Sequence, residues 1–197
     1  MKAPRQQRFL AIALTGLLPA LTGLMTPHPD AVPNTHAPGH VDRPELVPFI
    51  VADPARLPGI VVDETAATLV GPWQYSTHTP PYVGIGYLHD QREGKGTKSA
   101  TFTPDLPHSG RYEVRLAHCY NVRRSTNTPV TIRHAEGEIT VRINQQGKPP
   151  HGRLFRSLGI FRFERGRAGY VRIGNEGTEG KYVIADAVQF IPLAAEP

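Results

Sequence analysis

Short runs of apolar residues that alternate with polar ones follow one another from residue 58 almost to the end of the chain. Gly, Pro, Asn or Asp bounds each run, which is typical of strands joined by turns. No run repeats its apolar residues with the spacing of a helix over three turns. About nine strands are expected, in GIVVDET, ATLVGPWQYS, KSATFTP, GRYEVRLAHCY, PVTIRHA, EITVRIN, GIFRFERG, GYVRIGN and YVIADAVQFIP. The pattern predicts an all-β domain of antiparallel sheets, packed as a β-sandwich or jelly roll.

The N-terminal part of the chain has a different pattern. A basic start, MKAPRQQR, precedes the apolar run FLAIALTGLLPALTGLM, which predicts a signal peptide over residues 1–25 and hence a secreted or periplasmic protein. The cleavage site is poorly marked, so an uncleaved membrane anchor stays an alternative. Residues 26–57 are rich in Pro and His and lack periodicity, which predicts a disordered linker. A single folded domain is then expected over residues 58–193.

Arginine recurs at the polar positions of the expected strands. In RYEVRLA the apolar Tyr112, Val114 and Leu116 are expected to face the core, which turns the intervening arginines outward. Residues 111–172 contain 13 Lys and Arg against 4 Asp and Glu. This arginine-lined sheet face is either an ordinary solvated surface or a platform that grips a polyanion through planar guanidinium groups. The outward arginines are Arg111, Arg115, Arg133, Arg142, Arg162 and Arg172.

The stretch HDQREGKGTK contains glycines and lysines but does not match a phosphate-binding loop. Such a loop needs Gly-Lys followed by Ser or Thr at the start of a helix, whereas Gly96 follows Lys95 and the next run is strand-like. Nucleotide binding is therefore not expected, and the two lysines, Lys95 and Lys98, would at most attract an acidic chain. No nucleic-acid-binding motif is visible, and an exported chain favours an acidic polysaccharide over nucleic acid as the polyanion.

Four segments carry a resemblance to a known family. They are YLHDQREGKGTKSATFTPDLPHSGRYEVRL, RSTNTPVTIRHAEGEITVRINQQ, SLGIFRFERGRAGYVRIGNEGTEG and VIADAVQF. In this order they resemble the accessory β-domain shared by golvesin and the non-catalytic C-terminal part of xanthan lyases, over about residues 58–192. The resemblance implies a jelly-roll sandwich of galactose-binding-like architecture and attachment to polysaccharide. It implies no particular set of binding residues.

An aromatic cluster is the first candidate for a sugar-binding site. Aromatic rings pack on the apolar C–H faces of sugars, and polar neighbours pair with the hydroxyls. The segment GPWQYSTHTPPYVGIGYLHD is rich in Pro and Gly and is expected to form a long loop. For Trp73 the alternative is a core position between the sheets. The candidate residues are Trp73, Tyr75, Tyr82, Tyr87, His89 and Asp90.

Polar loops between strands are the second candidate. Arg123, Arg124 and Asn127 in CYNVRRSTNTP could bind a carboxylate and a hydroxyl together. The alternative for Asn127 is a turn cap before the following proline. Asn144 and Gln145 in NQQGKPPHGRLF occupy a comparable loop after a strand.

Two residues stand inside apolar runs. Cys119, the sole cysteine, is expected to be a small buried residue without a disulfide partner. Asp186 in YVIADAVQF is expected to accept backbone N–H groups or to help hold a structural cation. A structural calcium ion is plausible for sandwich domains of this kind, but the sequence has no Asp-rich loop, so no cofactor or metal is predicted.

Three classes of function remain. The favoured hypothesis is an exported, non-catalytic module that binds polysaccharide, with acidic polymers preferred. The second is a structural or adhesive domain that contacts a protein of the cell envelope or matrix. The third is a polysaccharide lyase or hydrolase: Tyr87, His89 and Arg92 could be given lyase roles, but their spacing does not require it, and no nucleophile elbow or metal-ligand triad is visible.

Overall fold

A computed structural model describes residues 52–194, which are almost entirely strands and loops. The helical elements of this region are two short 3-10 turns, η1 (Pro54–Arg56) and η2 (Glu64–Ala66). Each predicted run contains a strand, whereas β4 is missing from the prediction because it is short and follows a Pro- and Gly-rich segment. The strands are β1 (Ile60–Asp63), β2 (Thr68–Val70), β3 (Gln74–Ser76), β4 (Tyr87–His89), β5 (Ser99–Phe102), β6 (Gly110–Ala117), β7 (Thr128–His134), β8 (Gly137–Ile143), β9 (Phe155–Phe163), β10 (Tyr170–Gly174), β11 (Ile184–Ala185) and β12 (Ala187–Pro192).

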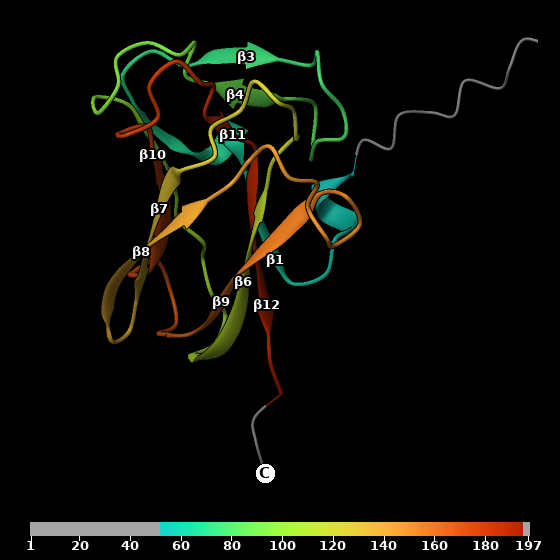
Figure 1. Ribbon diagram of the computed structural model, residues 1–197. Helices are drawn as coiled ribbons and strands as arrows, with labels where there is room; N and C mark the ends of the chain where they lie inside the picture. The colour runs from blue at the N-terminus through green and yellow to red at the C-terminus, as the bar shows by residue number, and fades with distance from the viewer. Residues whose placement is uncertain (1–51, 195–197) are drawn as a thin grey trace, which may run out of the picture. The chain divides into compact units, whose positions relative to one another are not determined.

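Two larger antiparallel sheets form the body of the domain (Figure 1). The first has the strand order β1-β12-β6-β9 and the second has the order β2-β5-β10-β7-β8. The last strand, β12, pairs with both β1 and β6, so the two ends of the domain meet in one sheet. This arrangement confirms the predicted antiparallel β-sandwich of jelly-roll type.

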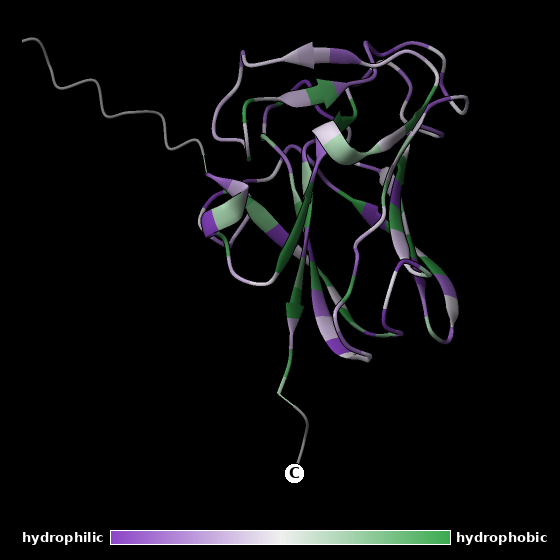
Figure 2. Ribbon diagram, turned by 180° about the vertical axis from the view of Figure 1, so that it is seen from behind, coloured by the Kyte–Doolittle hydropathy of each residue, from purple (hydrophilic) through white to green (hydrophobic). Residues whose placement is uncertain are grey.

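The hydrophobic core lies between the two larger sheets. Val114 and Leu116 from β6 pack in one cluster with Ile132 from β7 and Ile173 from β10, and all four side chains are fully buried. Figure 2 shows the hydrophobic and hydrophilic residues alternating along these strands. The predicted inward set of β6 is therefore confirmed. Each such side chain contributes about 1.5–3 kcal/mol by leaving water.

A small third sheet, with the order β11-β4-β3, lies at one end of the sandwich, at the top of Figure 1. Its strands are only two or three residues long. β11 pairs with β4 through Ile184 and His89, and β3 pairs with β4 on its other side. This sheet brings together three segments that are far apart in the sequence, at residues 74–76, 87–89 and 184–185.

The outward arginines do not share one face. Strand registers place three of them on the first sheet and three on the second, on the sides that face away from the core. The expectation of a single arginine-lined face is therefore wrong: alternation along a strand fixes the outward direction but not the sheet to which the strand belongs. Arg111, Arg115 and Arg162 belong to β6 and β9, and Arg133, Arg142 and Arg172 belong to β7, β8 and β10.

The folded domain begins before residue 58. Ala52 is buried, its amide donates to the carbonyl of Tyr82 at 3.4 Å, and its carbonyl accepts from the amide of Gly84 at 3.0 Å. The predicted linker therefore ends earlier than residue 57. The predicted signal peptide and the rest of the linker lie outside the described residues. Within residues 52–194, no helix is long and apolar enough to cross a membrane.

Candidate functional site

A pocket of about 220 Å³ lies at the end of the sandwich that carries the small sheet. We call it the end pocket. Its walls come from β3 and the loop after it, from β4, from the loop between β6 and β7, and from the segment before β11. The lining residues are Ser76, His78, Thr79, Tyr87, His89, Asn121, Arg123, Arg124 and Tyr182.

The register between β3 and β4 decides which side chains reach the end pocket. Ser76 lies opposite Tyr87, and Gln74 lies opposite His89, so these residues share one face of the pair. Tyr75 lies between them and points to the other face. The same alternation that lines the pocket with Tyr87 and His89 therefore keeps Tyr75 out of it.

Arg124 is the polar centre of the end pocket. The residue is only 6 % exposed. Its Nη2 donates to the Thr79 hydroxyl at 3.2 Å and to the Tyr87 hydroxyl at 3.3 Å, while its Nε has no hydrogen-bond partner. Within residues 52–194, no carboxylate forms an ion pair with this guanidinium. A buried cation without a counter-ion attracts anions strongly, because little water screens it.

Tyr182 provides an aromatic wall beside this charge. The guanidinium carbon of Arg124 lies 5.6 Å from the centre of the Tyr182 ring, and that of Arg92 lies 4.8 Å from it. The His89 ring meets Tyr182 edge-on, with 5.1 Å between the ring centres. Cation–π and edge-to-face contacts of this kind hold the ring in one orientation.

Hydrogen bonds fix the loop that carries the two pocket arginines. The Asn121 side chain accepts from the amide of Arg123 at 3.0 Å, and its carbonyl accepts from the amide of Arg124 at 3.0 Å, which makes a tight turn. The side-chain amide of Gln146 donates to the carbonyls of Val122 and Arg124, at 2.9 Å each. The loop is therefore held in place before any ligand arrives.

The environment of His89 favours its neutral form. Burial lowers its pKa, and the charge of Arg124 lowers it further, although Asp90 opposes the shift. Its Nδ1 accepts from the amide of Gln91 at 3.2 Å. A neutral imidazole that accepts at Nδ1 carries its proton on Nε2, so His89 offers a donor to a sugar hydroxyl.

Asp90 lies in the interior, which corrects the expectation that it faces a ligand. It is completely buried, and it accepts from the amide of Val183 at 2.9 Å and from the side-chain amide of Asn175 at 3.2 Å. Lys95 forms an ion pair with its carboxylate, and Lys98 donates to its carbonyl at 2.7 Å. These lysines tie the glycine-rich loop to the fold and are not arranged to attract an acidic chain.

The loop after β8 also differs from the expectation. Gln145 is completely buried, where its side chain donates to the carbonyl of Ile184 at 2.8 Å and accepts from the amide of the same residue at 2.9 Å. Asn144 is exposed and caps a turn by accepting from the amide of Gln146 at 2.9 Å. Asn127 is exposed as well. Neither asparagine lines the end pocket.

The predicted aromatic cluster divides into three environments. Trp73 packs against the main core and donates to the carbonyl of Val70 at 3.2 Å, as the alternative of a core position expects. Tyr75 is 44 % exposed and donates to the carbonyl of Ile85. Tyr82 packs behind Tyr87, with 6.0 Å between ring centres. Of these four rings, only Tyr87 lines the end pocket.

Four predicted site residues, Tyr87, His89, Arg123 and Arg124, thus line one pocket, although the sequence assigned them to two separate candidates, and the prediction misses their companions. The missed residues are Ser76, His78, Thr79, Asn121 and Tyr182. The polar run STHT, which begins at the last residue of β3, could have indicated the first three. Tyr182 gives no local signal, because its position in the pocket depends on a bridge between its backbone and that of Arg124.

Cys119 lies directly beneath the end pocket. It is completely buried and unpaired, as expected, and burial raises the pKa of its thiol to about 11. Its sulfur accepts from Nη2 of Arg124 at 3.5 Å. A thiol with this pKa stays protonated at neutral pH and acts as a small packing group.

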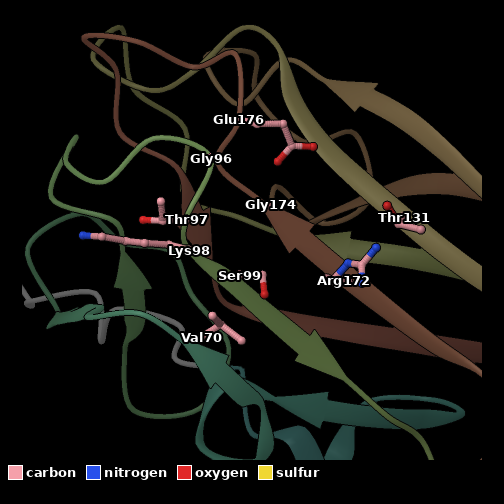
Figure 3. Close-up of a pocket in the computed structure, with 9 residues that line it drawn as sticks. All are labelled: Val70, Gly96, Thr97, Lys98, Ser99, Thr131, Arg172, Gly174 and Glu176. Carbon is pink, nitrogen blue, oxygen red and sulfur yellow. The ribbon is translucent and has the colours of Figure 1, made fainter.

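A second hollow of about 270 Å³ lies on the outer side of the larger five-stranded sheet (Figure 3). Arg172 and Glu176 provide its charges, while Lys98 runs away from Arg172 toward its internal partner. Because its lining includes a carboxylate as well as the cation, this hollow attracts anions less than the end pocket does. It is lined by Val70, Gly96, Thr97, Lys98, Ser99, Thr131, Arg172, Gly174 and Glu176.

A family model described as the golvesin C-terminal domain matches residues 60–192. This range includes every strand from β1 to β12 and the whole end pocket. The chain belongs to the golvesin C-terminal domain family. The resemblance found in the four sequence segments is therefore confirmed.

Two xanthan lyases each contain a region that is similar to this chain. The chain is 37 % identical over 163 residues to a xanthan lyase of Bacillus sp. (strain GL1), which covers 81 % of this chain and 16 % of that enzyme. The structure of a Paenibacillus xanthan lyase superimposes with a TM-score of 0.64 and 38 % identity, over 68 % of this chain and 13 % of that one. The chain thus spans only a small part of these enzymes.

A more distant structure shares the fold alone. A Podospora anserina β-(1,4)-mannanase with a module named CBM35 matches with a TM-score of 0.50 and 17 % identity, over 70 % of this chain and 28 % of the mannanase. This match agrees with the sandwich architecture of the golvesin-type domain.

Proposed function

We propose that this golvesin-type domain is an exported, non-catalytic module that binds an acidic polysaccharide in the end pocket. The carboxylate of a uronate or pyruvate-bearing sugar pairs with Arg124, and Arg123 adds a second positive charge at the rim. Tyr182 packs on a sugar face. The hydroxyls of Ser76 and Thr79, together with His89, bond to the sugar hydroxyls.

The observation that carries this proposal is the state of Arg124. Its guanidinium is buried and already oriented by Thr79 and Tyr87, yet it lacks an anionic partner among the described residues and has a free Nε–H. Burying a charge is costly unless an opposite charge compensates it. A carboxylate that enters the pocket supplies this compensation, whereas a neutral sugar does not.

The composition of the end pocket supports binding without catalysis. No carboxylate is among its lining residues, so the pair of carboxyl groups that a glycosidase needs is not present there. The Tyr87 hydroxyl, which would be a lyase acid or base, accepts from Arg124 and from Ser76 at 3.2 Å, and the residue is only 1 % exposed. These contacts leave Tyr87 poorly placed to exchange a proton with a substrate.

Xanthan is the first ligand to test, because the two relatives above are named xanthan lyases. Export fits this proposal, since the polymer would be met outside the cell.

The alternative function, contact with another protein, is favoured by apolar side chains at the surface: Val122 is 76 % exposed and Ile85 is 67 % exposed.

Affinity electrophoresis of the purified domain in gels that contain xanthan, alginate, pectin or a neutral glucan tests the proposal. We expect retardation in one or more of the acidic gels and little in the neutral one. Equal retardation in all gels would remove the role of charge. No retardation in any gel would favour the protein-contact alternative, and release of unsaturated uronate products would show that the domain is an enzyme.

A further inference from the structure

Three carboxylates meet at a point away from the end pocket. Asp63 ends β1, Glu64 begins η2, and Asp186 lies between β11 and β12. One oxygen from each lies within 4.8 Å of the oxygens of the other two. We call this group the carboxylate cluster. Calcium binds oxygen at about 2.3–2.6 Å, so two ligand oxygens on opposite sides of one ion lie about 4.6–5.2 Å apart. The spacing therefore fits one shared ion.

The hydrogen bonding of the cluster is incomplete. Glu64 is only 4 % exposed, and neither of its carboxylate oxygens has a hydrogen-bond partner. Oδ1 of Asp63 is also buried without a partner. Asp186 is completely buried and accepts only from the amide of Val83, at 3.1 and 3.4 Å. A buried carboxylate with no donor is costly, and the cost is removed by a cation or by protonation.

No positively charged side chain compensates the cluster. Among the described residues, none of its three carboxylates forms an ion pair with Lys, Arg or His. The three carboxylates therefore lie together inside the domain with no cationic side chain from residues 52–194 to balance them.

We propose that the carboxylate cluster is a calcium site. All its side-chain ligands are carboxylate oxygens, which Ca²⁺ prefers, whereas structural zinc sites use Cys and His. Backbone carbonyls or water complete the coordination. Mg²⁺ gives up its water shell reluctantly and suits a buried protein cage less well than Ca²⁺.

The position of the cluster determines what the ion stabilises. Asp63 and Asp186 come from the first strand and the C-terminal part of the domain, so one ion joins both ends of the sequence. Asp186 also holds the amide of Val83, and a Cβ added to Gly84 would lie 2.4 Å from Oδ2 of Asp63. Residues 77–86 lie between β3 and β4 and lead into Tyr87. Calcium therefore fixes the loop that leads into the end pocket.

Thermal unfolding of the purified full-length protein, with Ca²⁺, with Mg²⁺ and with EDTA, tests the proposal. At a hundredfold excess over Kd we expect Ca²⁺ to raise Tm by about 5–10 °C over EDTA. Mg²⁺ should give a much smaller shift. Titration calorimetry of the metal-free protein with Ca²⁺ should show about one ion per chain. Equal Tm values in Ca²⁺ and EDTA, or an equal shift with Mg²⁺, would overturn the assignment.

Two variants separate a specific site from general ion binding. Glu64→Gln removes a buried charge and is expected to fold, with the Tm shift caused by Ca²⁺ lost. Glu179→Gln, at an exposed position, should keep the full shift. A shift that survives in Glu64→Gln would show that calcium binds elsewhere. Because the readout is metal binding and not sugar binding, it stands whether or not the end pocket binds polysaccharide.

Discussion

The guanidinium of Arg124 lies 5.6 Å from the centre of the Tyr182 ring, and a parallel bridge joins the backbones of the same two residues. The amide of Tyr182 donates to the carbonyl of Arg123 at 3.0 Å, which continues this contact. Segments almost 60 residues apart in the sequence thus place a buried positive charge beside an aromatic wall. The proposed recognition of acidic sugars depends on this pairing.

The Tyr182 ring should contribute directly to binding. Tyr182→Ala removes the aromatic wall, and we expect affinity for the retained acidic polysaccharide to fall about tenfold, because ring contacts contribute about 0.5–1.5 kcal/mol beyond area burial. Affinity electrophoresis over a series of polymer concentrations measures the change. Tyr75→Ala, on the opposite face of β3, is the matched control and should bind as the wild type does. Equal losses in both variants would contradict a role for the end pocket.

Charge at the pocket rim should matter more than charge on the sheets. Arg123→Ala should weaken binding about threefold to tenfold and reduce its dependence on salt, because an exposed positive charge near the ligand is removed. Arg172→Ala removes an exposed arginine from the second hollow and should leave the affinity unchanged. The measurement is the dissociation constant at low and high NaCl. A larger effect from Arg172→Ala would move the site to the hollow of Figure 3.

The sequence predicted correctly those features that depend on neighbouring residues along the chain, such as strands and turns. Strict alternation in RYEVRLA identified the buried side of β6, and the turn residues marked nearly every strand. It failed for Asp90 and Gln145, since a polar residue next to a turn usually faces solvent. Asp90 instead binds the amide of Val183 and Gln145 binds both backbone groups of Ile184, contacts that depend on the tertiary fold.

The candidate site was predictable only in part for the same reason. Tyr87 and His89 lie in one aromatic segment, and Arg123 and Arg124 lie in one basic loop, so composition could indicate each pair. That the two pairs share a pocket follows from the small β11-β4-β3 sheet. β4 is too short to give a sequence pattern, and the run YVIADAVQFIP was expected to be a single strand, so the pairing of β11 with β4 and the position of Tyr182 escaped prediction.

Asp90 should be one of the most important residues for stability. Asp90→Ala removes the carboxylate that pairs with the Lys95 ammonium and accepts from the amide of Val183, and we expect the free energy of unfolding to fall by about 3–5 kcal/mol. Urea denaturation followed by tryptophan fluorescence measures it through Trp73. Asp105→Ala, at an exposed position, should change stability by less than about 0.5 kcal/mol. A similar small change in Asp90→Ala would refute the internal role.

His118 should make the domain sensitive to acid. Burial lowers its pKa to about 4 from a usual value near 6.5, and neither ring nitrogen has a hydrogen-bond partner. Between these values the unfolded chain binds the proton and the folded domain does not. Stability from this residue is therefore complete above about pH 6.5 and decreases by about 3 kcal/mol as the pH falls toward 4.

Urea denaturation between pH 4 and pH 7 checks the effect of His118. In His118→Leu the free energy of unfolding should depend less on pH than in the wild type, whereas His108→Leu, at an exposed position, should keep the wild-type profile. Parallel profiles for the wild type and His118→Leu would show that other groups cause the acid sensitivity.

The most direct test of acid recognition compares one sugar with and without its charge. Titration calorimetry of the domain with a xanthan oligosaccharide, and with the same oligosaccharide after its carboxyl groups are reduced to alcohols, isolates the contact that Arg124 is proposed to make. We expect the native oligosaccharide to bind at least about tenfold more tightly, a difference of about 1.4 kcal/mol or more. Equal affinity for the two forms would contradict the proposed contact with Arg124. So would a difference in affinity that persists in both Arg124→Lys and Arg124→Gln.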